Sequence, residues 1–474
     1  MADFKLQQPE LERSRESPAL AGRGVRASQA VVEAVFGPRI EREFDVSYWD
    51  GTIEPAGTGS GPEFSLRFAR PGALRRLLLP ANELTIAEAF MSGDVEIEGN
   101  IESAMGLGDS MGARLQSPGA FARLLPKLLV LPRDSAAEKN EAVQSRFSRA
   151  LKLAGGNRRS SDADAIQYHY DVGNDFYALW LDQQMVYTCA YFRTNEDDLA
   201  SAQIAKMDHI CRKLRLEPGM KMLDIGCGWG ALIMHAVQNY GVEGVGITLS
   251  KAQAELGAER IAAAGLSDRC RVEVGDYRDL DGGPQFDRIT SVGVTEHVKA
   301  DQQPAYFQTA HRILKPGGLF LNHCEVSIAR SRSSTLASRV KDRMWRRGAF
   351  IDKYVFPDTK LVPAAHVIAS AESTGFELRD VESLREHYTL TLRHWLRRLE
   401  EHREEAVGMV GIRVYRTWRL YLATAAYAFD TGRLNIIQTL LAKPHADGRS
   451  GVPLTRDYMY EQRTPIKLSK GAAA

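Results

Sequence analysis

Long apolar runs and an apolar leader are missing from this sequence of 474 residues. Nothing approaches the run of about 18 apolar residues that a transmembrane helix requires, and the longest apolar stretch, residues 124–132, is interrupted by Pro126 and Lys127. The first residues lack the apolar segment of a signal peptide. These absences predict a cytoplasmic protein without a membrane-spanning segment.

Cysteine is also scarce. The five cysteines are an odd number, and none stands in a Cys-x-x-Cys pair or in the Cys/His spacing of a zinc site. Paired cysteines would indicate a disulfide framework, whereas unpaired ones are typical of a reducing compartment. We therefore expect free thiols and no bound metal.

Neither sign of charge is in excess. The chain has 61 Lys and Arg against 60 Asp and Glu, a net charge of +1, so we expect no nucleic-acid partner. A content of 44% hydrophobic and 26% charged residues is typical of globular proteins and excludes collagen-like, coiled-coil and wholly disordered chains. At about 100–200 residues per domain, the length predicts two to four domains.

The first third of the chain divides by its composition. Residues 1–28 are polar and charged without periodicity, which predicts a disordered tail. Residues 29–150 mix short apolar runs with turn residues and predict a small α+β domain, and the small polar residues of 151–164 predict a linker. Local patterns predict strands at 64–69 and 93–100 and helices at 83–93 and 119–152.

A different pattern begins near residue 165, where short apolar strands alternate with helical segments. This alternation predicts a doubly wound α/β sheet, and residues 380–442 are expected to be largely helical. The predicted strands lie within 221–230, 242–250, 270–277, 286–294 and 317–326, and the helices between them lie at 231–241 and 251–265.

A glycine-rich turn joins the first of these strands to the first helix. Its sequence is Asp-Ile-Gly-Cys-Gly-Trp-Gly, with glycines at Gly226, Gly228 and Gly230. Glycine lets a backbone approach a ligand closely, and a helix N-terminus presents free N–H groups. Because ligands of open α/β sheets bind at the carboxyl ends of the strands, the turn predicts a nucleotide-type site. The alternative is a glycine turn that binds nothing.

The turn differs from a dinucleotide site. That site has the pattern G-x-G-x-x-G and an acidic residue at the end of the second strand for the ribose. Here the second strand ends in residues 247–250, Ile-Thr-Leu-Ser, with no acid. An acid follows the third strand instead, at Asp276 and Tyr277, where it could meet an adenine amino group. A dehydrogenase is therefore disfavoured.

Eight ordered motifs extend this pattern, and together with the glycine turn they resemble the class I S-adenosylmethionine-dependent methyltransferases of the cyclopropane fatty acid synthase family. The resemblance implies a Rossmann-like methyltransferase domain over 165–465, and 29–150 resembles that family's N-terminal domain loosely. The motifs occupy 168–182, 185–192, 201–214, 276–280, 291–298, 314–323, 350–357 and 388–395.

The family's reaction is implied for this chain by the resemblance. The methyl carbon of S-adenosylmethionine is transferred to a cis double bond of an unsaturated phospholipid acyl chain, a carbocation results, and a base removes a proton so that a cyclopropane ring closes. Family members use bicarbonate or carbonate as this base. The matching catalytic residues are Cys189, Glu296, His323 and Tyr388. Taken singly, each would be read as a buried, capping or core residue.

The resemblance also implies the residues that bind S-adenosylmethionine. The glycines would line its methionine and ribose side, whereas other residues would meet the ribose hydroxyls, the adenine and the methionine part. The full set is Tyr187, Thr188, Asp224, Gly226, Gly228, Gly230, Thr248, Gln253, Asp276 and Tyr277.

Two residues depart from the family pattern. Ala425 stands where many bacterial relatives carry a cysteine, and Glu325 follows His323 by two residues where uncharged residues are usual. Glu325 could add negative charge near the carbocation or face solvent. These changes leave a methylene- or methyl-branched product open. An N- or O-methyltransferase of small molecules and a noncatalytic lipid-binding protein are further alternatives.

A basic segment lies between two of the motifs. Residues 330–347 contain seven Lys or Arg and one Asp, a net charge of 7 − 1 = +6, with Leu336, Met344 and Trp345 interleaved. Such a segment suits an anionic bilayer surface, so we expect peripheral membrane association. A solvated basic face and a nucleic-acid patch are the alternatives. The resemblance further implies a homodimer.

Overall fold

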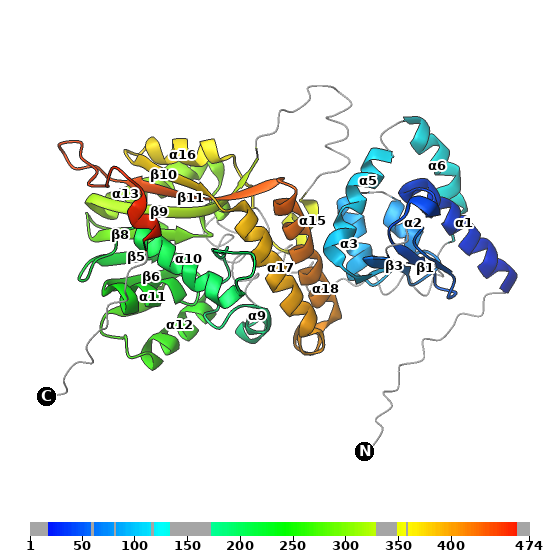
Figure 1. Cartoon of the computed structure of the whole chain (residues 1–474), viewed down its shortest axis with the longest axis horizontal. Helices are drawn as coiled ribbons and strands as arrows, with labels where there is room; N and C mark the ends of the chain where they lie inside the picture. Colours follow the sequence, from blue (N-terminus) through cyan, green and yellow to red (C-terminus); the bar gives the residue numbers. More distant parts are fainter. Residues whose placement is uncertain are drawn as a thin grey trace, which may run out of the picture. The chain divides into compact units, whose positions relative to one another are not determined.

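A computed structural model describes residues 18–57, 61–79, 82–114, 118–132, 172–328, 348–356 and 359–461. The chain divides into two compact units, Met1–Val143 and Gln144–Ala474. Figure 1 shows the smaller unit in blue and cyan and the larger one in green to red. The expected linker at 151–164 and the basic segment 330–347 both lie outside the described residues.

The smaller unit contains a four-stranded sheet in the order β2-β1-β3-β4, in which β1 and β3 are parallel and the other pairs are antiparallel. The predicted strands at 64–69 and 93–100 correspond to β3 and β4. Its strands are β1 (Asp45–Ser47), β2 (Ile53–Glu54), β3 (Phe64–Phe68) and β4 (Val95–Gly99), and its helices are α1 (Pro18–Phe36), α2 (Ala73–Leu78), α3 (Glu83–Met91), α4 (Ile101–Met105), α5 (Leu107–Arg114) and α6 (Pro118–Val130).

Helix α1 corrects the expected disordered tail over 1–28. Residues 18–28 belong to this helix, which buries Val25, Ser28, Val32 and Val35. These positions recur every three or four residues and therefore share one face of a helix. The pattern is faint in the sequence because small residues make up much of that face, so the segment reads as polar. Residues 1–17 lie outside the described residues.

The larger unit is built on a seven-stranded sheet in the order β10-β11-β9-β8-β5-β6-β7. The five strands predicted from the α/β pattern are β5 to β9, and they run parallel. Strand β11 is antiparallel to both of its neighbours. The strands are β5 (Lys221–Ile225), β6 (Glu243–Thr248), β7 (Cys270–Val274), β8 (Phe286–Val292), β9 (Leu314–Ser327), β10 (Glu377–Ser383) and β11 (Leu434–Ala442).

The expectation that residues 380–442 are largely helical is confirmed, although strands β10 and β11 form the two ends of that span. Helices α17 (Arg385–Glu401) and α18 (Arg403–Asp430) fill the middle of that span, but both of its ends are strands. From Ile436 to Ala442 every residue of β11 is buried. A strand covered on both faces has no polar alternation, so periodicity alone cannot distinguish it from a buried helix.

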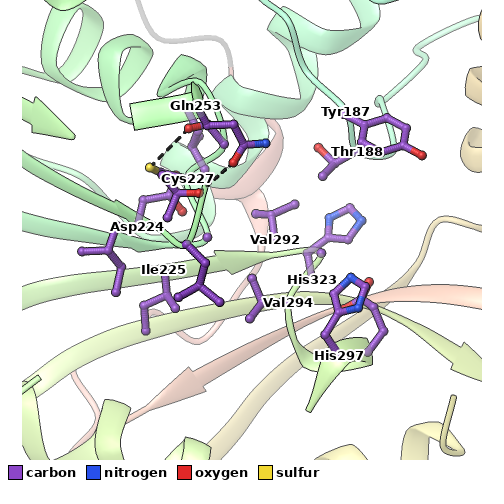
Figure 2. A pocket seen from close by; sticks show the side chains of 18 of the residues that line it. Tyr187, Thr188, Asp224, Ile225, Cys227, Gln253, Val292, Val294, His297 and His323 are labelled. Carbon is purple, nitrogen blue, oxygen red and sulfur yellow. Dashed lines mark hydrogen bonds between the residues drawn. The ribbon is translucent and has the colours of Figure 1, made fainter. Parts of the chain in front are cut away.

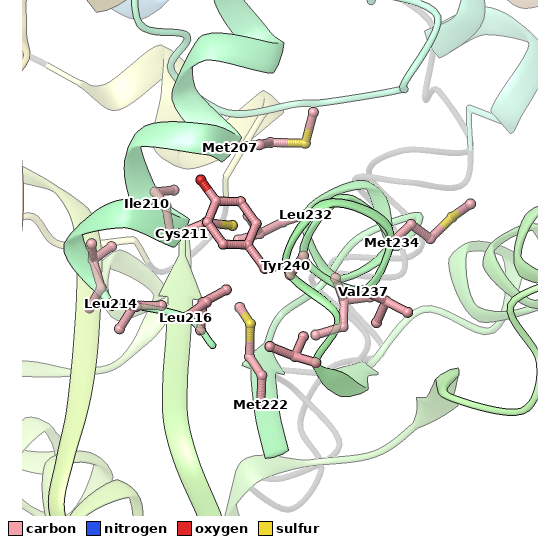
Figure 3. Close-up of a cluster of buried hydrophobic side chains, with 14 of the residues drawn as sticks. Met207, Ile210, Cys211, Leu214, Leu216, Met222, Leu232, Met234, Val237 and Tyr240 are labelled. Carbon is pink, nitrogen blue, oxygen red and sulfur yellow. The ribbon is translucent and has the colours of Figure 1, made fainter. Parts of the chain in front are cut away.

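Helices cover both faces of the sheet (Figure 1). On one face, α10 (Leu199–Lys213) and α11 (Ala231–Tyr240) pack a cluster of apolar side chains against the strands, as Figure 3 shows, and α12 (Lys251–Ala263) contributes Ile261. On the other face, α13 (Gln303–Ile313) and α16 (Ala364–Glu372) form a second cluster. Met222 joins the first cluster and Leu223 the second, as the alternation of side chains along a strand requires.

Three short helices complete the larger unit: α9 (Asn174–Trp180), α15 (Ala349–Tyr354) and α19 (Asp457–Tyr460). Helices α9, α17 and α18 contact one another. Within the part of the chain that the structure describes, no helix is both long enough and apolar enough to cross a bilayer.

Candidate active site

The glycine-rich turn follows β5 directly and has the backbone conformation that only glycine adopts at low cost. Gly226, Gly228 and Gly230 have φ values of 77°, 55° and 82°. A Cβ atom on Gly226 would lie 2.2 Å from Cγ2 of Val294, whereas one on Gly228 would meet nothing within 4 Å. Gly226 is therefore required for packing. Gly228 faces open space, where a ligand can approach the backbone of the turn.

A cavity lies beside this turn, at the carboxyl ends of the parallel strands. All of the predicted site residues except Gly230 line it. Gly230 caps α11, and a Cβ there would lie 3.1 Å from Cγ2 of Val272, so its place is in the packing of helix against strand. Figure 2 shows Asp224, Cys227 and Gln253 on one side of the cavity and Tyr187, Thr188, His297 and His323 on the other.

The cofactor side of the cavity is held by hydrogen bonds within the chain. The Thr248 hydroxyl donates to Oε1 of Gln253 at 2.7 Å, and both side chains are nearly buried. The Arg278 guanidinium holds the Asp276 carboxylate, with its Nε 2.9 Å from both oxygens. Arg278, which the sequence analysis did not single out, also lines the cavity and fixes Asp276 at its rim.

Lys206 is a second lining residue that the sequence pattern did not reveal. It is 2% exposed on α10, and its Nζ donates to Oγ1 of Thr188 at 2.8 Å. Burial lowers the pKa of Lys206 to about 8 and raises the pKa of Asp224 to about 7. The signal available in the sequence was its helical spacing with buried Gln203 and Ile210, which puts it on the inner face of its helix.

Cys189 is a buried thiol at the wall of the cavity. Its Sγ lies 3.2 Å from the carbonyl oxygen of Ala190 and 3.8 Å from that of Leu384. Burial raises the pKa of Cys189 well above its ordinary value, so the group is a neutral thiol that donates to carbonyls. This geometry suits a packing and positioning role and does not suit a nucleophile, which must be a thiolate.

His323 presents a donor to the cavity. Its Nδ1 lies 3.1 Å from Nε2 of Gln438, and this pairing assigns the ring proton to the other nitrogen. That nitrogen, Nε2, is buried and has no partner among the described residues. Burial lowers the pKa of His323 to about 3, so the ring is neutral.

Two carboxyl groups meet next to His323. The backbone N–H of Glu325 donates to Oε1 of Glu296 at 3.2 Å, and Oε2 of Glu296 is buried with no partner among the described residues. Burial is the main cause that raises the pKa of each carboxyl, and the charge of Glu325 raises that of Glu296 further. The Tyr388 hydroxyl hydrogen-bonds to Glu325 and partly offsets this rise. Glu325 therefore lines the cavity and does not face solvent.

The remaining walls are apolar and aromatic. Phe356, Tyr421 and Ile436 line the cavity beside Tyr388, whose ring packs on Phe429 at 4.7 Å. Ala425 is buried on α18 and is not among the lining residues, so the position that carries a cysteine in relatives lies off the cavity. Among the described residues, no three His, Cys, Asp or Glu side chains are grouped as a metal would require.

The arrangement brings a nucleotide-type turn and a proton-handling group into one cavity. A ligand bound at the glycine turn would place its far end toward Glu296, His323 and Tyr388. Neutral donors and a carboxyl pair at that end can hold or move a proton, and the aromatic wall can stabilise positive charge.

Comparison with known proteins matches both parts of the chain. Residues 157–439 match the family model described as mycolic acid cyclopropane synthetase, and residues 31–107 match a domain of unknown function. A probable fatty acid methyltransferase from Pseudomonas putida is 39% identical over 87% of this chain and 95% of its own length. A probable fatty acid methyltransferase from Mycobacterium tuberculosis is 34% identical over 90% of this chain and 98% of its own length.

A solved structure shares the architecture of the larger unit. That of the cyclopropane synthase MmaA2 from Mycobacterium tuberculosis is 35% identical, has a TM-score of 0.55, and is matched over 59% of this chain and 98% of its own. The mycolic acid cyclopropane synthase CmaA1, solved with SAH and CTAB, is 34% identical with a TM-score of 0.54 over 59% of this chain and 97% of its own.

Proposed function

Because this chain belongs to the mycolic acid cyclopropane synthetase family and is an S-adenosylmethionine-dependent methyltransferase, we propose that it acts on unsaturated phospholipid acyl chains. In this proposal the methyl carbon of S-adenosylmethionine is added across a cis double bond, and the product is a cyclopropane fatty acid. The fourteen residues predicted from the motifs are proposed as its site, with Gly230 acting through helix packing.

The observation that carries the proposal is the pairing of two environments in one cavity. The glycine turn leaves an open approach at Gly228, whereas Glu296, His323 and Tyr388 lie at the other end. Addition to an alkene needs a proton acceptor beside the transferred methyl group and an environment that excludes water from the cation. Methylation of an amine or hydroxyl passes through no carbocation, so the apolar and aromatic wall beside the carboxyl favours the alkene substrate.

The bicarbonate implied by the resemblance fits these residues in part. Oε2 of Glu296 and Nε2 of His323 are buried without partners and would accept from and donate to such an anion, which would supply an oxygen base. Of the other two residues, the chain around Cys189 would offer a backbone N–H, whereas the Tyr388 hydroxyl is already bonded to Glu325. A second carboxylate beside the site also disfavours an anion.

The test is mass spectrometry of lipids from cells that express the chain. A gain of about 14 Da on unsaturated acyl chains is expected, because one CH2 unit is added to a double bond. Derivatisation of olefins then separates a ring, which does not react, from a methylene-branched chain, which does. If the protein binds S-adenosylmethionine but the lipids of these cells show no such gain in mass, the proposed substrate is wrong.

Location at a membrane surface and assembly into a homodimer belong to the same proposal. The substrate lies in a bilayer, and the +6 charge of residues 330–347 supports attraction to anionic headgroups. The proposed location is therefore peripheral, at the cytoplasmic face of a membrane.

A further inference from the structure

Glu325 is the residue by which this site departs from the family pattern. It lies on β9 two positions after His323, so both side chains share one face of the strand, and both line the cavity. Its backbone N–H donates a hydrogen bond to Glu296, and its carboxylate accepts a hydrogen bond from the hydroxyl of Tyr388. Glu325 therefore already bonds to Glu296 and Tyr388, two of the residues that were expected to hold a bicarbonate anion.

The two carboxyls cannot both be charged at low cost. Both line the same cavity, and like charges at short range favour the state in which one carries a proton. The Tyr388 hydroxyl stabilises negative charge on Glu325, whereas Oε2 of Glu296 has no donor among the described residues. The shared proton therefore belongs on Glu296 and the negative charge on Glu325.

The charged and titratable groups around the pair are few. His323 is neutral, Cys189 and Cys324 are neutral thiols because burial raises the pKa of each, and the Nζ of Lys206 is bonded to Thr188. A positive charge that develops in the cavity would have the Glu325 carboxylate as a negative partner on this wall.

We propose that Glu325 is a further catalytic residue, whose carboxylate accepts the proton that the transferred methyl group loses as the ring closes. The inference rests on the proposed ring-forming reaction. The alkene electron pair forms a carbon–carbon bond to the methyl carbon, and the carbon–sulfur pair stays on sulfur. The electron pair of one methyl C–H bond then closes the ring, and the proton passes to Glu325. With Glu296 protonated, the pair is neutral after the step and releases the proton when product leaves.

The assignment makes added bicarbonate unnecessary for turnover. The Glu325 carboxylate, bonded to Tyr388 and placed beside Glu296, accepts the proton in place of the bicarbonate that the resemblance implies. Wild-type enzyme in bicarbonate-depleted buffer is therefore expected to turn over at the same rate as enzyme supplied with bicarbonate.

The test uses full-length Glu325→Gln, which keeps the size of the side chain and an acceptor for Tyr388. A general base contributes about 10²–10⁴-fold, so kcat should fall on that scale while the affinity for S-adenosylmethionine, measured by calorimetry, is unchanged. Glu325→Asp, which keeps a carboxylate, should retain a higher rate than Glu325→Gln. Glu372→Gln, at an exposed position on α16, is the matched control and should run at the wild-type rate.

The inference and the proposed function fail in different ways. If Glu325→Gln runs within about threefold of wild type, or wild type stops without bicarbonate, Glu325 is not the base. Glu325→Gln and Glu325→Asp at equal rates would contradict it too. If wild type binds S-adenosylmethionine and adds no carbon to any unsaturated acyl chain, the proposed function is wrong and the inference falls with it.

Discussion

The two ends of the cavity differ in whether their polar groups have hydrogen-bond partners within the chain. At the glycine turn the chain satisfies its own polar groups: Gly226 and Cys227 donate to the carbonyl of Ile247 at 2.9 and 3.0 Å, and Thr248 bonds to Gln253. At the other end, Oε2 of Glu296 and Nε2 of His323 are buried without partners among the described residues. Unpaired buried groups cost roughly 1–3 kcal/mol each. The first end is a preformed cradle, and the second is complete only with a reacting molecule in it.

Substitution at the unsatisfied end should give the largest effect on rate. Glu325→Gln removes the proposed base and should lower kcat about 10²–10⁴-fold, whereas Glu296→Gln resembles the protonated carboxyl and should stay within about tenfold of wild type. Affinity for S-adenosylmethionine should not change in either variant, because both residues lie away from the turn. Steady-state kinetics and calorimetry measure the two quantities. An equal loss of rate in the two variants would contradict the assignment of the shared proton to Glu296.

Substitution at the cradle should abolish binding and leave the fold. Gly228→Val puts a branched side chain into the open space that a ligand must approach, and the left-handed backbone costs about 1–2 kcal/mol. Calorimetry should detect no binding of S-adenosylmethionine. The matched control is Gly265→Val, because Gly265 has a φ of 68°, meets nothing within 4 Å and lies off the cavity. Equal binding by both variants would contradict the placement of the ligand.

Lys206 lies between the two ends and should affect stability. Lys206→Met removes the donor to Thr188, whose hydroxyl is only partly buried, so the free energy of unfolding should fall by about 0.5–1.5 kcal/mol. Lys221→Met, at an exposed position on β5, provides the control and should change stability little. Denaturant titration measures both. A Lys206→Met variant as stable as the control would show that the buried amine is not structural.

The pH dependence of kcat should distinguish the ends as well. Burial raises the pKa of both Glu296 and Glu325 above the ordinary range for glutamate. Because the base must be ionised, activity should be lost as pH falls through this raised pKa, well above the pH at which an exposed carboxylate titrates. The affinity for S-adenosylmethionine should not show this loss at low pH. A rate that is flat down to about pH 5 would contradict a buried carboxylate base.

The smallest effect on turnover is expected from the basic segment 330–347. Reversal of Arg343, Arg346 and Arg347 to Glu should weaken binding to anionic vesicles by about 1 kcal/mol per charge. Turnover of a soluble acyl substrate should be retained, since none of these three residues is among the predicted site residues. Vesicle flotation is the measurement. Unchanged flotation would identify the segment as an ordinary solvated basic face.

The cradle could be predicted from sequence because its chemistry is local. Glycines at positions 226, 228 and 230 need positive φ, and the strand and helix on either side are strongly patterned. The catalytic end depends on contacts between distant segments, such as the 29 positions that separate Glu296 from Glu325. Even so, the period of two along β9 puts Glu325 on the same face as His323, a signal that was present but not used.

Other errors have equally local causes. Residues 18–28 were expected to be disordered because small residues conceal the helical face of α1, and the strand β11 at the end of the largely helical span 380–442 was not separated from it because a strand buried on both faces shows no alternation. Lys206 was overlooked because lysine is rarely buried, although its helical spacing pointed inward.

The central claim is that the transferred methyl group loses one hydrogen to a base within this cavity. The most direct measurement uses S-adenosylmethionine with a fully deuterated methyl group and weighs the acyl product. Removal of one deuteron by the base predicts a gain of about 16 Da with no double bond remaining. A gain of about 17 Da would mean that all three deuterons are retained, and would contradict both the ring and the base at Glu325.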